Sequence, residues 1–394
     1  MSPWQRAGNW TLAYILKPLA QLALFTLGSV VIMSVIALII GVVLRTDWHG
    51  ISILKTRPGI DLLRQVIVQL PSTAIDGVTI GFVYAMIALG YTMVYGVLQF
   101  VNFAHSEIFM VGGVAGYEVI AFFRDNKTLG SVNPVVLILL MIVVGMVVSA
   151  LLAVLIERFA YKPLRRAPRL VPLIAAIGVS FFLQDFVRAI EALHRNEFNF
   201  SYPTDQVPFL ALRQSFIINI PWSNGTIPFG ASIGMNSVVV IVFAIITLLG
   251  LNYFVTGTKI GKGIRAVSQD QATASLMGIN VNGMISLTFL VGGGLGGAAG
   301  VLFGLKTGYL TPYIGFFPGL KAFTAAVLGG IGEIQGAMLG GILLGILEAF
   351  FAGLLPYFPA FGTGYRDILA FGVLIAILIF RPTGLLGKRA DEKV

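Results

Sequence analysis

The sequence predicts an all-α polytopic membrane protein with about ten transmembrane helices. Hydrophobic residues make up 57% of the 394 residues and charged residues only 11%, whereas soluble domains average about 25% charged residues. A transmembrane helix needs roughly 20 consecutive, mostly apolar residues, and the chain contains several such runs. The 47 glycines also fit a membrane bundle, because small residues let neighbouring helices approach closely.

The first apolar run covers residues 19–44, and we interpret it as a transmembrane span. It is longer than the roughly 7–15 apolar residues of a signal peptide, and no clear small-residue cleavage site follows it. A mixed-charge linker occupies residues 45–70, of which 62–70 favour a short amphipathic helix. We therefore expect residues 1–70 to form an N-terminal extension with one extra span, and residues 71–390 to form the main membrane domain.

Nine further spans follow the linker. One of them, at 318–331, is short for a straight span, so we expect a half-helix or a re-entrant segment there. The predicted spans lie at 72–98, 102–123, 134–157, 170–190, 237–256, 281–305, 318–331, 336–355 and 366–381.

Basic residues indicate the orientation of the bundle. They gather in the loops at 158–169 and 257–272 and in the C-terminal tail, and membrane proteins carry their Lys and Arg residues mainly in cytoplasmic loops. Ten spans with both termini in the cytoplasm place all three regions there and put residues 191–236 outside. The basic linker at 45–70 also falls outside, against the rule. The net charge of +9 thus reflects membrane topology, and we expect no nucleic-acid partner.

Two segments interrupt the helical pattern with polar, aromatic, Gly and Pro residues, at 90–107 and at 304–319. They occupy corresponding positions in two predicted halves, spans two to five and spans seven to ten, which run in opposite directions in this topology. Inverted repeats with broken helices near the transport path are typical of membrane transporters. We therefore expect both segments to lie close to the path of a solute.

Glycines recur every fourth residue at 292–308 and at 332–340. Residues four apart share one face of a helix, so these ridges indicate close helix contacts. A nucleotide-binding loop is excluded because no Lys followed by Ser or Thr comes after the glycines. The absence of cysteine excludes disulfides and thiolate metal sites, and the three histidines lie too far apart in sequence for a metal site.

The segment 102–107 places Asn102, His105 and Glu107 within six residues at a span boundary. Ionisable groups at membrane depth are rare and usually face a cavity or the bundle interior, which favours a gate or a path-lining element. The alternative is a helix cap in which Asn102 or Ser106 starts the next helix. The chemistry of these residues does not separate the two.

The loop after the sixth span predicts an amphipathic helix from Ile264 to Met277. Ile264, Val267, Ala274 and Met277 share an apolar stripe, and Gly278 is suited to end the helix. Such a helix could insert into a groove on a partner protein or rest on the membrane surface.

The sequence resembles the LivH-type permeases of branched-chain amino acid ABC importers. The resemblance is carried by residues 88–96, 101–105, 177–184, 261–280, 312–332 and 381–387, and it extends over residues 71–390, the permease domain. It departs from the family at Gln269, where Glu is frequent, and at Ser106, where Gly is usual. The extension at 1–70 lies outside the usual pattern.

The resemblance implies a bacterial inner-membrane importer subunit that moves branched-chain or other small neutral amino acids. Its expected partners are a LivM-like second permease, two cytoplasmic ATPases, a periplasmic binding protein and the lipid bilayer. ATP and Mg belong to the ATPases, so we expect no catalysis and no cofactor in this chain. The loop at 261–280 would be the coupling helix that enters the ATPase, through Arg265, Ala266, Asp270, Ala274, Leu276 and Gly278.

Such an amino acid is zwitterionic and has an apolar side chain, so we expect a largely uncharged path lined by small and aromatic residues and a few amides. The candidates are Tyr91, Tyr95, Asn102, Phe103, His105, Phe316, Phe317 and Phe323; the alternative for each aromatic is ordinary packing or an interfacial position.

Two other functions stay open. Related permeases serve urea and short amides. A stand-alone channel or secondary transporter would use buried carboxylates, for which the candidates are Asp76, Glu107, Glu118, Asp185, Glu333 and Glu348.

Overall fold

The computed structural model describes residues 15–43, 61–165, 167–168, 170–196, 198–203, 207–222, 225–330, 332–358, 362 and 364–387. In this part of the chain eight helices are long and apolar enough to cross a membrane, which confirms the all-α polytopic class. They are α2 (Lys17–Val43), α3 (Leu62–Leu98), α4 (His105–Asp125), α5 (Pro134–Ile156), α6 (Leu170–His194), α8 (Met235–Gly257), α11 (Val281–Thr307) and α13 (Ile334–Leu354).

Two shorter helices occupy the remaining predicted spans. They are α12 (Phe316–Gly329), with 14 residues, and α14 (Tyr365–Phe380), with 16 residues. The expectation of a short eighth span is confirmed. The residues before α12 form only the two-residue strand β4 (Tyr309–Leu310) and turns, so the predicted break between the seventh and eighth spans is present.

The predicted separate helix at 62–70 is wrong. These residues form the first turns of α3, which continues through Pro71 for 37 residues. The helix is about 55 Å long at a rise of 1.5 Å per residue, and it therefore crosses the predicted boundary between the extension and the permease domain. Asp61 caps its start by accepting a hydrogen bond from the Arg64 backbone N–H.

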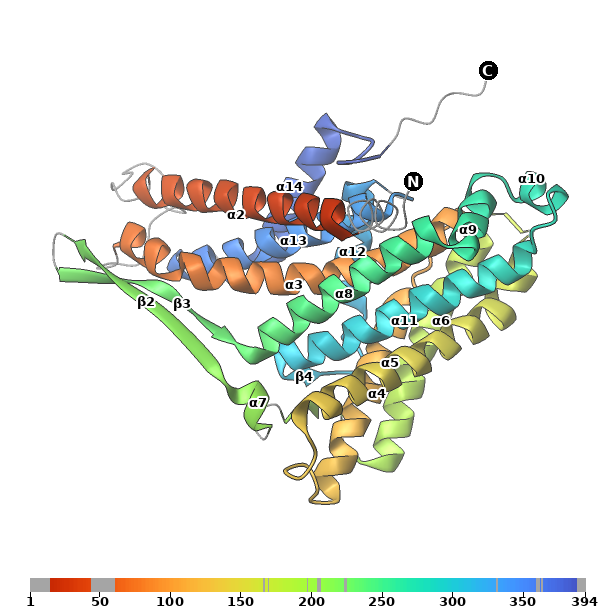
Figure 1. The fold of residues 1–394 in the computed structure, drawn as a ribbon, viewed down its shortest axis with the longest axis horizontal. Coiled ribbons are helices and arrows are strands. Elements are labelled where there is room, and N and C mark those ends of the chain that lie inside the picture. Colours follow the sequence, from red (N-terminus) through yellow and green to blue (C-terminus); the bar gives the residue numbers. More distant parts are fainter. Residues whose placement is uncertain are drawn as a thin grey trace, which may run out of the picture.

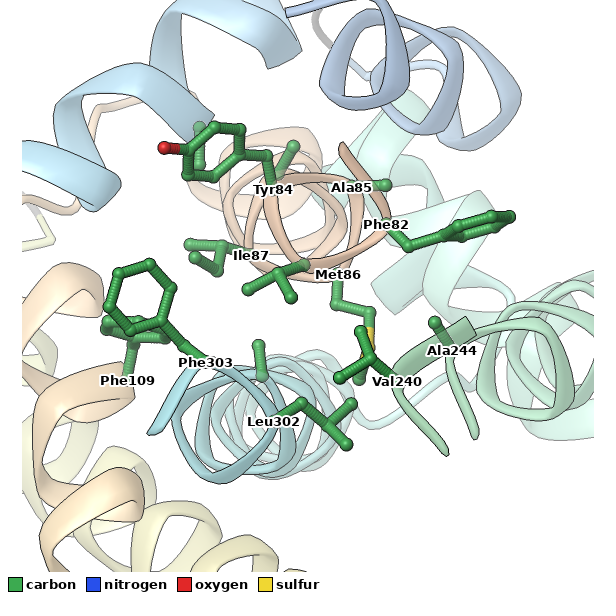
Figure 2. Packing of buried hydrophobic residues seen from close by; sticks show 14 of the residues in the cluster. Phe82, Tyr84, Ala85, Met86, Ile87, Phe109, Val240, Ala244, Leu302 and Phe303 are labelled. Carbon is green, nitrogen blue, oxygen red and sulfur yellow. The ribbon is translucent and has the colours of Figure 1, made fainter. Parts of the chain in front are cut away.

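The centre of the bundle is formed by α3, α11 and α13, with α4 and α5 packed on α11. Figure 2 shows Met86 of α3 pointing toward Val240 and Ala244 of α8, while Tyr84 points to the opposite side of α3. Phe109 of α4 packs against Phe303 of α11 at a ring distance of 5.6 Å.

Glycines bring these helices into backbone contact, as the sequence predicts. A Cβ atom on Gly81 of α3 would lie 2.8 Å from the Cα atom of Ile342 in α13. On Gly300 of α11 it would overlap the backbone carbonyl of Phe109 in α4. Such contacts replace the hydrophobic driving force that is missing between helices in lipid.

The two ends of the bundle differ (Figure 1). One end, the hairpin end, carries the antiparallel strands β2 (Arg213–Trp222) and β3 (Gly225–Gly234), preceded by the short helix α7 (Pro208–Ala211). The strand β1 (Phe200–Ser201) pairs there with β4. The other end carries α9 (Lys259–Gln269) and α10 (Gln271–Leu276).

The α3 and α11 helices end in the same way. The residue after α3, Gln99, has a φ of 58°, and the residue after α11, Gly308, has a φ of 79°. Each donates its backbone N–H to the carbonyl four residues earlier, on Tyr95 and Gly304 respectively. The two interruptions that the sequence places at equivalent positions thus share one type of helix end.

Candidate functional site

Six of the eight predicted path residues form one group, which we call the inner cluster: Tyr91, Tyr95, Asn102, Phe103, His105 and Phe323. The Tyr91 ring meets the His105 ring edge-on at 4.8 Å and lies 6.0 Å from the Phe323 ring. Phe103 lies 6.1 Å from Phe323, and Tyr95 and Asn102 line the same small space as Tyr91.

The inner cluster is closed. The space between its side chains measures about 10 Å³, which is close to the minimum that holds one water molecule. No amino acid passes through a gap of this size, so a solute path through the cluster requires the aromatic side chains to separate.

Phe316 and Phe317 do not join the inner cluster. They stand at the start of α12, 49% and 64% exposed, with their rings edge-on to each other at 5.5 Å. Phe317 lines a different and much larger space.

The structure contradicts the helix-cap interpretation of residues 102–107. The residue before α4 is Ala104, and no side chain caps the helix. Asn102 instead accepts a hydrogen bond of 2.6 Å from the Tyr161 hydroxyl, and Ser106 donates one of 2.6 Å to the Phe103 carbonyl. Both side chains are buried, which favours the gate or path-lining interpretation.

Glu107 is fully buried within the bundle. Its Oε1 atom accepts hydrogen bonds from Gln184 at 2.8 Å and from Ser180 at 3.1 Å, both in α6. Both residues belong to the stretch 177–184 that carries the family resemblance, but no role is predicted for them from the sequence. Their spacing of four residues in an otherwise apolar helix is the signal that could have paired them with Glu107.

The two broken segments meet at Glu107. A Cβ atom on Gly315, just before α12, would lie 2.5 Å from Glu107 Oε2, and one on Gly319 would overlap the Ser106 side chain. Glycine also makes room for His105, because a Cβ atom on Gly90 of α3 would overlap the imidazole ring.

A cleft of about 550 Å³ lies between α3, α11, α12, α13 and α14. We call it the charged cleft. Lys321 of α12 lies 2.9 Å from Glu348 of α13 and 2.9 Å from Asp367 of α14, and Arg366 lies 3.5 Å from both carboxylates. The Tyr84 hydroxyl donates a hydrogen bond of 2.8 Å to Glu348.

A second ion pair lines the same cleft. Lys306 of α11 lies 2.7 Å from Asp76 of α3 and donates a hydrogen bond of 2.9 Å to Ser237. Asp76 and Glu348 are among the carboxylates predicted for a competing ion-coupled transporter, whereas no role is predicted from the sequence for the other charged residues of the cleft, Lys306, Lys321, Arg366 and Asp367.

Other charged groups gather at the hairpin end. Arg195 donates hydrogen bonds of 2.9 and 3.0 Å to Glu118 and a further one to Asp125. The hydrogen bonds to Glu118 raise the pKa of Arg195 above its ordinary value, so this guanidinium stays charged. Burial raises the pKa of Tyr202, whose hydroxyl donates to the Gly113 carbonyl.

The predicted single helix from Ile264 to Met277 is wrong. It is divided at Asp270, which has an extended backbone and caps α10 by accepting hydrogen bonds from the backbone N–H groups of Ala272 and Thr273. Gly278 follows with a φ of 81°, consistent with the predicted end.

The apolar stripe on α9 and α10 is only partly as predicted. Ile264, Val267 and Ala274 are buried, but Met277 is 79% exposed, and the neighbouring Leu276 is 88% exposed. The break at Asp270 changes the helix direction, so positions beyond it no longer continue the stripe. Of the other predicted coupling residues, Arg265, Asp270 and Gly278 are exposed and Ala266 is half-buried.

The α9–α10 region is packed onto the end of α3. Ile264, Val267 and Ala274 belong to the same buried cluster as Val94 and Val97 of α3. Gln271 adds a hydrogen bond of 2.8 Å from its side chain to the Val97 carbonyl. Tyr91 of the inner cluster lies one helical turn before Val94, so α3 links the two regions directly.

Among the residues that the structure describes, no group of His, Cys, Asp or Glu side chains has the arrangement of a metal site.

Comparison with known proteins gives consistent matches. The family model for the permease component of branched-chain amino acid transport systems matches residues 73–378. The high-affinity branched-chain amino acid transport system permease protein BraD of Pseudomonas aeruginosa is 40% identical over 320 residues, which is 81% of this chain and 96% of the relative. LivH of Escherichia coli K12 gives the same identity and coverage. A probable LivH permease of Methanocaldococcus jannaschii is 27% identical over 309 residues, covering 77% of this chain and 88% of the relative.

Proposed function

We infer the function of this chain from its family, because the chain belongs to the permease components of branched-chain amino acid transport systems. It is a multi-pass membrane protein. We propose that it is one of two permease subunits of an ABC importer in the bacterial inner membrane, with both termini in the cytoplasm. The solute is a branched-chain or other small neutral amino acid.

The proposed partners would supply the remaining parts of the importer. A LivM-like permease would complete the membrane channel, and a periplasmic binding protein would deliver the solute at the hairpin end. Two cytoplasmic ATPases would hydrolyse ATP with Mg, so this chain itself would not be an enzyme and would hold no cofactor.

The connection between α9–α10 and the inner cluster is the observation that carries this proposal. The exposed Leu276 at the end of α10 offers an apolar contact to a partner, while the buried side of α9 is packed on α3. Displacement of α9 and α10 by an ATPase would move the end of α3, and with it Tyr91.

Alternating access requires that the path be open to one side at a time. The charged cleft is wide and lies toward the hairpin end, whereas the inner cluster, nearer α9 and α10, is closed. This arrangement fits an importer in an outward-open state, with the path closed on the cytoplasmic side.

The test is co-purification in mild detergent with the ATPase subunits. Leu276→Arg places a charge on a side chain that is 88% exposed, so the bundle should fold while the ATPases are lost. Leu193→Arg is the matched control, because Leu193 is 90% exposed at the hairpin end and should leave the ATPases bound. The combined variant Asp270→Arg and Gly278→Trp is a more drastic version that also removes the cap of α10.

A second measurement separates the competing function. If the unchanged chain retains no ATPase and leucine uptake continues in ATP-depleted cells, the importer proposal is refuted and a stand-alone transporter becomes the better account. If ATP-dependent uptake is seen for urea or acetamide but not for leucine, the permease serves amides.

A further inference from the structure

The charged cleft has the dimensions of a solute site, which the inner cluster lacks. Its volume of about 550 Å³ lies within the roughly 300–1,000 Å³ of small-molecule sites. Ile80, Phe303 and Ile314 contribute apolar side chains to its walls. The apolar side chain of a solute can therefore be buried against these walls, in the same cleft that holds the charged groups.

The charges of the cleft balance. Its lining residues include three cations and three anions, so their formal sum is zero: Lys306, Lys321 and Arg366 against Asp76, Glu348 and Asp367. Because the lining of the cleft has no net charge, it does not favour a solute with a net charge of either sign. It suits a zwitterion, whose two opposite charges can each meet a partner.

Stability alone does not account for this buried ion pair. Lys321 and Glu348 have side chains only 7% and 9% exposed, and removing charges of this kind from water costs about as much as their attraction returns. Ionisable residues at membrane depth are usually functional and face a cavity. Lys321 is the only charged residue of α12, a helix of 14 residues.

Two of the four clustered charges are accessible from the cleft. The side chain of Arg366 is 43% exposed and that of Asp367 is 30% exposed. The buried pair of Lys321 and Glu348 lies behind them, with Glu348 further held by the hydroxyl of Tyr84. The buried Lys321 and Glu348 thus hold the accessible Arg366 and Asp367 in place through their ion pairs.

We infer that Arg366 and Asp367 form a binding site for the carboxylate and ammonium groups of an α-amino acid with an apolar side chain. The proposal rests on the proposed function and specifies where the solute is held. A guanidinium has five N–H donors in a planar fork that matches a carboxylate, so its two ion pairs do not exhaust it. Asp367, the adjacent residue, supplies the negative charge for the ammonium group.

Urea and simple amides carry no net or separated charges, and they would gain little from this site. Isocaproate keeps the carboxylate of leucine without its ammonium group, and isoamylamine keeps the ammonium group without the carboxylate. These three classes of competitor distinguish recognition of a zwitterion from recognition of a single charge or a dipole.

The experiment is binding of tritiated leucine to the complete chain in lipid nanodiscs, with its copurifying membrane subunits but without the periplasmic binding protein, which would itself bind leucine. Unlabelled leucine should compete, and isocaproate, isoamylamine and acetamide should each compete roughly tenfold more weakly or worse, given that a hydrogen bond to a charged group contributes about 1.5–3 kcal/mol. Equal competition by either single-charge analogue, or the absence of saturable leucine binding, overturns the site.

Two substitutions test the residues. Arg366→Gln and Asp367→Asn should each weaken leucine binding roughly tenfold. Thermal melting should be unchanged for Arg366→Gln, whose side chain is 43% exposed, and lowered for Asp367→Asn, because Asp367 also pairs with the buried Lys321; Arg366→Gln is therefore the cleaner test. Arg124→Gln is the matched control, because Arg124 and Asp125 form another adjacent Arg–Asp ion pair at a helix end, 3.1 Å apart, and binding should not change. Unaltered binding in both cleft variants overturns the proposal, and if a variant fails to fold, the analogue series on the unchanged chain decides.

The binding result and the proposed function can fail separately. ATP-dependent leucine uptake by a transporter whose permease shows no leucine binding would overturn the site and leave the importer intact. Absence of ATP-dependent uptake would overturn the importer, whatever the binding result.

Discussion

The inner cluster and the charged cleft share the helices α3 and α12 and differ in size, charge and composition. Tyr84 and Tyr91 lie seven residues apart on α3, yet Tyr84 holds a buried carboxylate and Tyr91 packs among aromatic rings. On α12, Lys321 faces the cleft and Phe323 faces the inner cluster. One region is wide and charged, and the other is closed and aromatic.

In the proposed transport cycle, this contrast would let the short helix α12 contribute to two states of the solute path. Because α12 contributes to both regions, a shift of α12 against α3 that separates Phe323 from Tyr91 must also move Lys321 within the cleft. Four substitutions test this division, and we give them from the largest expected effect to the smallest.

Lys321→Met should destabilise the protein most, because it leaves Glu348 buried without its closest cation. Loss of one partner of a buried ion pair costs about 3–5 kcal/mol. Thermal unfolding in detergent measures the effect. The double variant Lys321→Met and Glu348→Met should recover most of the loss, and a double variant as unstable as the single one would show that the ion pair is not the cause.

Gly90→Ala should disturb the inner cluster, because the new methyl group would overlap the His105 ring. Overpacking of this kind costs about 1–3 kcal/mol. His105→Ala in the same chain should restore stability. Gly96→Ala on the same helix is the matched control, since its Cβ atom would have no neighbour closer than 4.0 Å. Equal melting of both single variants would contradict the close contact.

Asp270→Ala tests whether α9 and α10 act as two helices or as one. Removing an N-cap side chain costs about 0.5–2 kcal/mol, here confined to α10. Hydrogen exchange should increase across residues 271–276 while the exchange of α3 stays unchanged. Protection equal to that of the unchanged chain would mean that the cap does not hold α10.

Glu118→Gln should have the smallest effect. Its partner Arg195 lies at the hairpin end, and the side chain of Glu118 is 32% exposed, so the pair contributes about 1 kcal/mol, the upper end of the range for exposed pairs because its geometry is bidentate. The melting temperature should change little, and leucine uptake should be retained. A loss of stability comparable to that of Lys321→Met would remove the distinction between the cleft and the periphery of the bundle.

Much of the fold could be predicted from the sequence because lipid imposes simple rules on it. The spans follow from apolar runs, and the close helix contacts follow from glycines such as Gly300. The residues of the aromatic inner cluster could also be singled out from the polar and aromatic segment at 90–107, but the predicted interruption is shorter than that segment: α3 continues to Leu98 and includes Tyr91, whereas Asn102 lies between α3 and α4.

The charged cleft was not predictable from local patterns. Lys321 and Glu348 are 27 residues apart in sequence and meet only because α12 and α13 pack side by side. The β2–β3 hairpin was missed because residues 213–234 lie within the long segment 191–236, which the predicted topology treats as one external loop. The division at Asp270 was missed because an amphipathic period continues across an N-cap that changes the helix direction.

The pairing of β1 with β4 has a consequence for how the protein is made. The segment before α12 is held by the hydrogen bond of 2.9 Å from the Tyr202 backbone N–H to the Gly308 carbonyl, and by Phe200 opposite Leu310. Phe200 and Tyr202 leave the ribosome about a hundred residues earlier than their partners. This pairing therefore cannot form until residues 308–310 have been synthesised, so the position of the segment before α12 is set only after the whole of α11 (Val281–Thr307) has been made.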